Sequence, residues 1–372
     1  MKKTLLAAAL AVGFAGVAQA ETSVTLYGIV DTGIGYTQFK DKDSDVKSSK
    51  TGLYDGVQSG NRWGLKGSED LGNGLKAIFQ LESGFNINGG NSLQGNRLFG
   101  RQATLGLSSD SWGTVNFGRQ TNIASQFLGG ITSPFGDAFK EAHIGSSFRS
   151  MATVRADNVV SYVTPNFSGF QFGVGYSFNT GGDQAFDVKN AGSNPDDGNV
   201  KLITTGLRYA NGPLAIGASY DQLDSENYAS KVKAYNVAAS YDFEVVKLHL
   251  GWGQERKGTL AGFGFDDGAT GGIDVGESAG FIADSFKTNN YSVGLSAPVG
   301  AGKVMAGWQS SRLASGAYRD AQAKSSQNLY SLGYTYDLSK RTNLYAVGTY
   351  GTGYAYQNVR VTQGIVGLRH QF

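Results

Sequence analysis

Few residues in this chain have the types and spacing that catalysis or metal binding requires. The chain has no cysteine, and its three histidines, His143, His249 and His370, form no spacing typical of a metal site. No local motif indicates a serine hydrolase, and no glycine-rich phosphate loop opens a helix. The aspartates of segment 181–201 do not match a calcium loop, which favours a solvated acidic loop over a cation site. The sequence therefore predicts no cofactor, no metal and no enzyme activity.

Charged residues on one face of alternating strands indicate a different chemistry, the attraction of ions. Arg62 and Lys66 lie on the face opposite Trp63, and the same alternation turns Glu82 and Arg155 toward the polar face. Charges that line a water-filled passage can select ions by sign. Each of these side chains alone is equally consistent with a solvated rim. Several together favour a role in ion passage.

Such residues need strands to position them, and the alternation of apolar and polar residues that is typical of strands runs through most of the chain. At the C-terminus, Val366, Leu368 and Phe372 share one face, while Arg369 and Gln371 share the other. The same pattern recurs at 170–178, 214–221, 233–243, 246–253 and 290–297. Aromatic residues stand near the ends of the apolar faces, as interface girdles do. One apolar and one polar face along so many strands predict a transmembrane β-barrel.

The first twenty residues have the features of an export signal. A basic start, Met1-Lys2-Lys3, precedes an apolar run over residues 5–17 and the cleavage motif Ala18-Gln19-Ala20. The run is too short to cross about 30 Å of hydrocarbon, and no later segment approaches the ~20 apolar residues of a spanning helix. We therefore expect a signal peptide over 1–20 and one barrel domain over 21–372.

Composition and connection lengths agree with a barrel. The chain holds 55 Gly, 19 Tyr and 21 Phe but 5 Pro, and its 32 basic residues nearly balance 30 acidic ones, so nothing favours nucleic-acid binding. Short turns alternate with eight long connections, which predict about sixteen strands. The long connections are 37–59, 86–97, 122–154, 181–201, 223–231, 255–287, 312–326 and 352–360.

Several segments in combination resemble the general porins of Gram-negative bacteria, of the betaproteobacterial type. They are 23–31, 61–72, 75–82, 100–102, 117–120 and 366–372. The resemblance covers 21–372 and implies an all-β fold, a 16-stranded antiparallel transmembrane barrel whose long third loop, 122–154, folds into the lumen. It also implies a homotrimer in the outer membrane, in contact with lipid and lipopolysaccharide, that passes ions and small hydrophilic solutes.

The resemblance also implies which residues form the constriction. It places charges of the wall at Arg62, Arg101, Arg155 and Glu82, and acidic residues on the third loop. Lys66, which shares the inward face with Arg62 by alternation, is expected to lie behind them. That loop here reads Pro134-Phe135-Gly136-Asp137. The family's loop glutamate is missing, although Asp137 remains and Glu141 follows. For Arg101 the two lines of reasoning disagree. The resemblance turns it inward, whereas its alternation with Ala103 turns it outward unless a bulge follows it.

Two further roles follow from position and resemblance. Arg119 has outward parity and is expected to contact another subunit, and the terminal aromatic Phe372 is expected to serve as an assembly signal. The leading function is passive diffusion with a mild preference for anions. One alternative is a substrate-selective channel. A row of inward aromatic residues would favour it, but the sequence has few of them, such as Tyr27. The other is an outer-membrane hydrolase.

Overall fold

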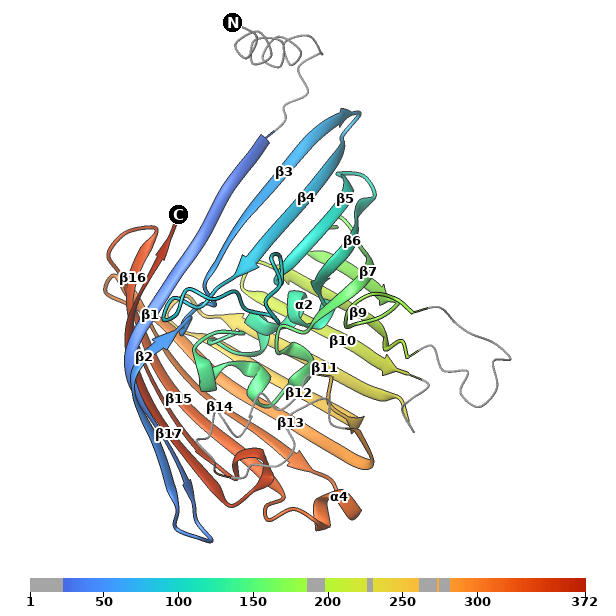
Figure 1. The fold of residues 1–372 in the computed structure, drawn as a ribbon. Helices are drawn as coiled ribbons and strands as arrows, with labels where there is room; N and C mark the ends of the chain where they lie inside the picture. The colour runs from blue at the N-terminus through green and yellow to red at the C-terminus, as the bar shows by residue number, and fades with distance from the viewer. Residues whose placement is uncertain (1–22, 186–197, 226–229, 261–272, 274–281) are drawn as a thin grey trace, which may run out of the picture.

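The computed structural model describes residues 23–185, 198–225, 230–260, 273 and 282–372. The predicted signal peptide, residues 1–20, lies outside these ranges. Within them, 17 strand segments form one antiparallel sheet that closes on itself (Figure 1). The first strand pairs with the last on one side and with the second and third on the other. The second and third are therefore two halves of one interrupted strand, and the barrel has 16 strands.

The strands take their labels in chain order: β1 (Ser23–Asp41), β2 (Lys47–Asp55), β3 (Arg62–Gly72), β4 (Leu75–Gly84), β5 (Gln102–Ser109), β6 (Gly113–Thr121), β7 (Arg155–Val163), β8 (Phe170–Ser177), β9 (Lys201–Asn211), β10 (Leu214–Asp224), β11 (Val232–Asp242), β12 (Lys247–Gly258), β13 (Ile282–Val299), β14 (Gly302–Leu313), β15 (Ser326–Asp337), β16 (Thr342–Thr352) and β17 (Val359–Gln371). The helices are α2 (Ile123–Thr132), α4 (Ala317–Asp320) and four 3-10 turns, η1 (Lys140–Ala142), η2 (Ile144–Ser146), η3 (Arg149–Met151) and η4 (Tyr354–Tyr356). Within the described ranges, no helix is both long and apolar enough to cross a membrane.

The alternation predicted from the sequence is confirmed on the outer face. Leu105, Phe117 and Val366 are 65%, 50% and 60% exposed, while Thr104 and Gln363, on the opposite face, are buried. An apolar outer face is what a membrane barrel turns to lipid.

The long connection expected at 37–59 is wrong. β1 continues to Asp41 and pairs there with both β2 and β17, so only a short hairpin over 42–46 remains. The polar composition of this stretch concealed the strands, because both faces of these hydrophilic strand ends are polar apart from a few residues such as the buried Phe39. Apolar alternation identifies a strand only where one face meets lipid or a core.

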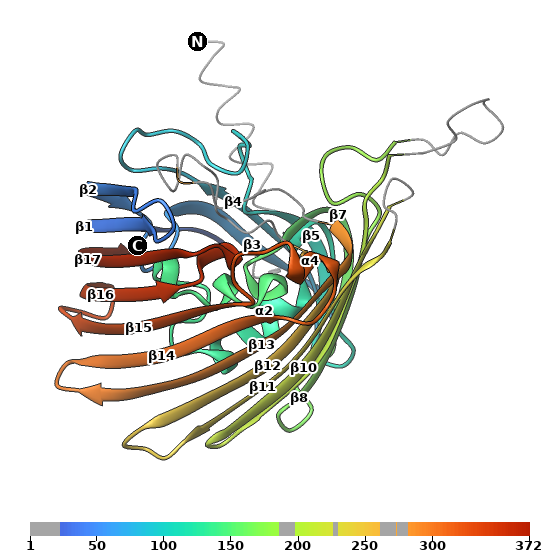
Figure 2. The same cartoon turned by 90° about the horizontal axis from the view of Figure 1, so that it is seen from below.

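Segment 122–154 packs against the inner face of the wall, and both views place α2 within the curve of the strands (Figures 1 and 2). Asn122 caps α2 by accepting a hydrogen bond from the Ser125 amide, and its Nδ2 donates to Asp221 Oδ1 at 3.0 Å. The helix contacts β9, β10, β11 and β12 most extensively.

Glycines of the wall make room for this helix. Ile123 and Leu128 are fully buried in a cluster with Phe127 and Phe148. A side chain added at Gly217 would collide with Leu128 Cδ2, because the helix lies directly on the backbone there. The inner face of β8–β12 is thus filled by apolar side chains of segment 122–154.

Candidate functional site

The distal part of segment 122–154 is fastened to the break between β2 and β3. The Phe139 amide donates to the Val57 carbonyl at 2.7 Å, and both side chains are buried in one cluster with Tyr345. The break itself, residues 56–61, is held by the buried carboxylate of Asp31, which accepts hydrogen bonds from the Ser59 amide and the Tyr345 hydroxyl, each at 2.6 Å. A second inward segment therefore faces the loop.

A cavity of about 540 Å³ lies between these two segments and the wall. The charged residues that line it are Arg62, Arg101, Asp137, Lys140, Glu141, Arg149 and Arg155. Five are basic and two are acidic. His143 and Thr153 add polar atoms to the same lining. The structure thus brings together every predicted constriction residue except Lys66 and Glu82, and adds Lys140 and Arg149.

Glu82 stands behind the arginines and is largely compensated by them. Its Oε1 accepts a hydrogen bond from Arg101 Nε at 2.7 Å and lies 4.0 Å from Arg62 Nη1. Its Oε2 accepts from the Tyr27 hydroxyl at 3.0 Å. A carboxylate with such partners orients the guanidinium groups and offsets one of their positive charges beside the cavity.

Arg101 lines the cavity, so the outward orientation expected from its parity is wrong and the orientation implied by the resemblance agrees with the structure. β5 begins at Gln102, which pairs with Glu82, and Arg101 precedes the ladder. Strand parity does not apply to a residue outside the strand. Arg155 Nε donates to the Arg101 carbonyl at 3.1 Å and fills a place that a strand partner would otherwise take.

Lys66 lies elsewhere. It is exposed, its Nζ sits 5.4 Å from the centre of the Tyr27 ring, and it lines a separate cavity of about 300 Å³ with Gln80 and Thr104. Lys66 follows Arg62 by four residues along β3, so the two share a face but stand at different heights. The structure does not bring Lys66 to the cavity of the arginines.

The two acidic residues of the loop differ in their surroundings. Asp137 is exposed, and its Oδ2 accepts a hydrogen bond from Thr153 Oγ1 at 2.8 Å. Glu141 is half-buried and accepts from the Tyr354 hydroxyl of η4 at 3.2 Å. Burial raises the pKa of Glu141, and the hydrogen bond from Tyr354 opposes that shift. Asp137 is therefore the better placed of the two to act on a passing ion.

The basic residues that sequence reasoning missed lie in the 3-10 turns of the loop. Burial lowers the pKa of both Lys140 and Arg149. Nearby carboxylates, Asp55 first, oppose the shift of Lys140, and Tyr356 followed by Glu255 opposes that of Arg149. Burial, together with the positive charge of Arg149, lowers the pKa of the nearby His143 to about 4. No strand or helix period points to these residues. The one available signal was their place in the predicted third loop.

Arg119 is occupied within the chain. Its Nε donates to the Gly100 carbonyl at 2.6 Å, and its Nη1 pairs with Asp157 Oδ1 at 2.6 Å. A role in subunit contact stays a prediction. Phe372 exchanges two backbone hydrogen bonds of 3.1 Å with Gly28 where β17 meets β1, and its role as an assembly signal also stays a prediction.

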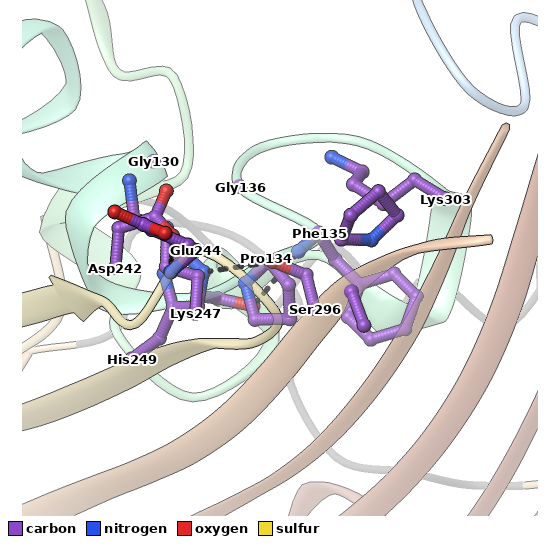
Figure 3. Close-up of a pocket in the computed structure, with 13 residues that line it drawn as sticks. Gly130, Pro134, Phe135, Gly136, Asp242, Glu244, Lys247, His249, Ser296 and Lys303 are labelled. Atoms are coloured by element: carbon purple, nitrogen blue, oxygen red, sulfur yellow. Dashed lines mark hydrogen bonds between the residues drawn. The ribbon is translucent and has the colours of Figure 1, made fainter.

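A second cavity, of about 470 Å³, lies between residues 130–136 and one end of β11–β14 (Figure 3). His249 Nδ1 is 3.1 Å from the Ile131 carbonyl, so the histidine ties the end of α2 to the wall. Two acidic residues, Asp242 and Glu244, and two basic residues, Lys247 and Lys303, line this cavity, so their formal charges balance. Among the described residues, no group of His, Asp or Glu could hold a metal ion. Of the predicted acidic loop, Asp187, Asp196 and Asp197 lie outside the described residues and Asp183 within them.

Comparison with known proteins places the chain among proteins of the same architecture. The Gram-negative porin family matches residues 7–355. An outer membrane porin protein of Bordetella pertussis is 52% identical over 396 residues and covers 100% of both chains. Outer membrane porin protein 32 of Delftia acidovorans is 36% identical over 93% of this chain and 88% of its own. The solved anion-selective porin from Comamonas acidovorans superposes with a TM-score of 0.70 at 29% identity, over 95% of this chain and 100% of that one.

Proposed function

This chain belongs to the Gram-negative porins of the outer membrane, and we propose that it is a passive diffusion channel with a mild preference for small anions. The observation that carries the proposal is the excess of basic side chains around one cavity, five against two. In this proposal, segment 122–154 narrows the channel, and the cavity beside Arg62, Arg101 and Arg155 is the path of the ions.

The charge beside the cavity sets the ion preference of the channel, because the formal charge of the whole chain is close to zero. Exposed charges farther away than about 8 Å are screened at physiological ionic strength. An ion that passes the cavity is within that distance of the arginines. Glu82 offsets part of their charge, but its partners fix it behind Arg101. The Comamonas porin that superposes on this chain is described as anion-selective, which supports the same sign.

The test is the zero-current potential of single channels in a gradient of potassium chloride. We expect a mild chloride preference in the natural protein, and Arg62→Ala and Arg155→Ala should each move the potential toward potassium. Arg319→Ala, which removes an exposed arginine of α4 paired with Asp320, is the matched control and should leave it unchanged. Clear potassium preference in the natural protein would refute the proposal. Unchanged selectivity in the double variant would place the ion path elsewhere. Conductance that saturates with one solute would favour the substrate-selective alternative.

We also propose that three copies associate through the side of the barrel formed by its short strands, β5–β8. β5, β6, β7 and β8 have 8, 9, 9 and 8 residues, against 19 in β1 and 18 in β13. Eight residues at about 3.3 Å, tilted by ~40°, rise only about 20 Å, less than the ~25 Å apolar band of such barrels. Partner copies would cover exposed apolar residues such as Leu105. An unboiled sample should migrate as a trimer on a denaturing gel and as a monomer after boiling; a monomer in both would contradict this.

A further inference from the structure

Two peptide carbonyls on either side of Arg101 are held by side chains and not by the strand ladder. The Gly100 carbonyl accepts from Arg119 Nε at 2.6 Å, and the Arg101 carbonyl accepts from Arg155 Nε at 3.1 Å. The Arg101 amide donates to the Glu82 carbonyl at 3.1 Å. These two arginines fix the backbone on either side of Arg101, while Glu82 Oε1 holds its Nε at 2.7 Å. The direction of the Arg101 side chain therefore depends on the two arginines together with Glu82.

Arg119 is in turn oriented by a single carboxylate, that of Asp157. Its Nη1 bonds Asp157 Oδ1 at 2.6 Å, while Arg97 Nη1 contacts Oδ1 and Oδ2 at 2.6 and 2.7 Å. The Gly182 amide donates to Oδ2 at 2.7 Å. The Asp157 side chain is 11% exposed. Because the guanidinium is planar, fixing Nη1 on Asp157 fixes the direction in which Nε points toward Gly100.

An irregularity of the wall places Asp157 within reach of Arg119. The register of β6 against β7 shifts between Gly118 and Gln120, and Asn158 has φ of 51°. The Asp157 carbonyl accepts from Ser177 Oγ at 2.6 Å, and its amide donates to the Thr180 carbonyl at 3.1 Å. A bulge re-aims a side chain that would otherwise follow the alternation. This accounts for Arg119, which has outward parity but is only 16% exposed.

We propose that Asp157, acting through Arg119, is a positioning residue that sets the ion selectivity of the channel by fixing Arg101. This inference rests on the proposed function. Asp157 does not line the cavity of the arginines and acts on ions through the position of Arg101.

The proposal predicts a sign opposite to that of simple electrostatics. If Asp157 acted only as a fixed negative charge, its removal would raise the chloride preference. If it positions Arg101, then its removal releases Arg119 and lets Arg101 move, and the chloride preference falls. Displacing one charge from within about 4 Å of an ion in a water-like medium is worth at most about a fivefold change in the permeability ratio.

The experiment compares Asp157→Asn and Arg119→Lys in planar bilayers. Arg119→Lys keeps the charge but cannot bridge Asp157 and the Gly100 carbonyl with a rigid fork, so any change must come from geometry. Both variants should lower the ratio of chloride to potassium permeability relative to the natural protein and increase the current noise of the open channel. Asp320→Asn and Arg319→Lys alter an exposed pair of the same kind and should change neither.

A higher chloride preference in Asp157→Asn, or natural selectivity and noise in Arg119→Lys, would overturn the proposal. If Asp157→Asn does not assemble, Arg119→Lys alone decides, because it preserves the ion pair. Each variant's permeability ratio is compared with that of the natural protein. The test of Asp157 therefore remains decisive whichever ion the natural protein prefers. A natural channel that prefers potassium would therefore refute the proposed function without deciding the role of Asp157.

Discussion

The inner face of this barrel has two halves that use the same strand alternation for opposite purposes. Over β8–β12 the inward positions are rich in glycine, and α2 packs its apolar side chains onto them. Over β3–β7 the inward positions carry Arg62 and Arg155, and the cavity beside them stays open. Both halves look polar by alternation, because glycine and arginine each interrupt an apolar pattern. A polar inner face can therefore be either a seat for a loop or the lining of a passage.

The difference shows what makes a wall position accept a helix. A Cβ at Gly173 would lie 2.9 Å from Ile123 Cδ1, and one at Gly253 would lie 2.9 Å from Phe148 Cδ1. Glycine is needed there for close approach, since these positions have no positive φ. The apolar burial of the filled half then holds the loop, and the loop carries charges to the open half.

The largest expected effect is on the filled half. Leu128→Ala removes a fully buried side chain from the contact of α2 with the wall, and should lower the local free energy of opening of segment 122–154 by about 2–5 kcal/mol. Hydrogen exchange of the α2 amides measures that free energy. Leu332→Ala, on the outer face of β15 and away from the proposed subunit contact, is the control and should leave these amides unchanged. Unaltered protection in Leu128→Ala would mean that other contacts hold the loop.

An intermediate effect is expected from pH at the junction of the two halves. The pKa of His143 is about 4 in the fold, below its ordinary value near 6.5, so the folded state favours the neutral imidazole. The stabilisation that neutral His143 gives to segment 122–154 is fully present above pH 6.5. It is lost as the pH falls toward 4, because the histidine is then protonated in the opened state first. The loss is at most about 3 kcal/mol for a shift of this size. Protection of segment 122–154, corrected for intrinsic exchange rates, should fall over this range.

Glu141 opposes this trend, since burial raises its pKa and the folded state binds its proton more readily. His143→Gln should therefore remove the loss of protection at acid pH and leave a slight gain from Glu141. Arg149, Asp137 and Lys140 also act on His143, and only Asp137 raises its pKa. A loss of protection between pH 6.5 and 4 that persists in His143→Gln would assign the effect to another group.

Within the open half, the sequence predicted the residues of regular strands better than those beside a strand end or a bulge, for a physical reason. Arg62, Glu82 and Arg155 belong to strands, where alternation fixes the side of each residue. Arg101 precedes its strand and Arg119 stands beside a bulge, so parity could not predict the orientation of either side chain. A register shift depends on side chains far apart in sequence, such as Asp157, which alternation does not consider.

The barrel itself could be predicted because lipid imposes a pattern on every strand, including the final one with Val366 and Leu368. No comparable rule governs the 3-10 turns of the third loop. Lys140 and Arg149 were missed there, since their positions follow from how α2 seats on glycines and how Phe139 meets Val57. The hydrophilic hairpin over 42–46 was missed for the same reason, because it has no lipid-facing side.

The smallest expected effect separates the two acidic residues of the open half. Asp137 is exposed and Glu141 is half-buried against Tyr354, so a passing ion is acted on more by Asp137. Asp137→Asn removes one charge and should raise the ratio of chloride to potassium permeability by up to about fivefold, the limit for a charge about 4 Å from the ion in water. Glu141→Gln preserves an acceptor for Tyr354 and should raise the ratio less, because burial already raises the pKa of this carboxyl. The zero-current potential in a potassium chloride gradient measures both. A larger shift in Glu141→Gln than in Asp137→Asn would mean that the ion path follows the Tyr354 side of the cavity, and would reverse the ranking argued from exposure.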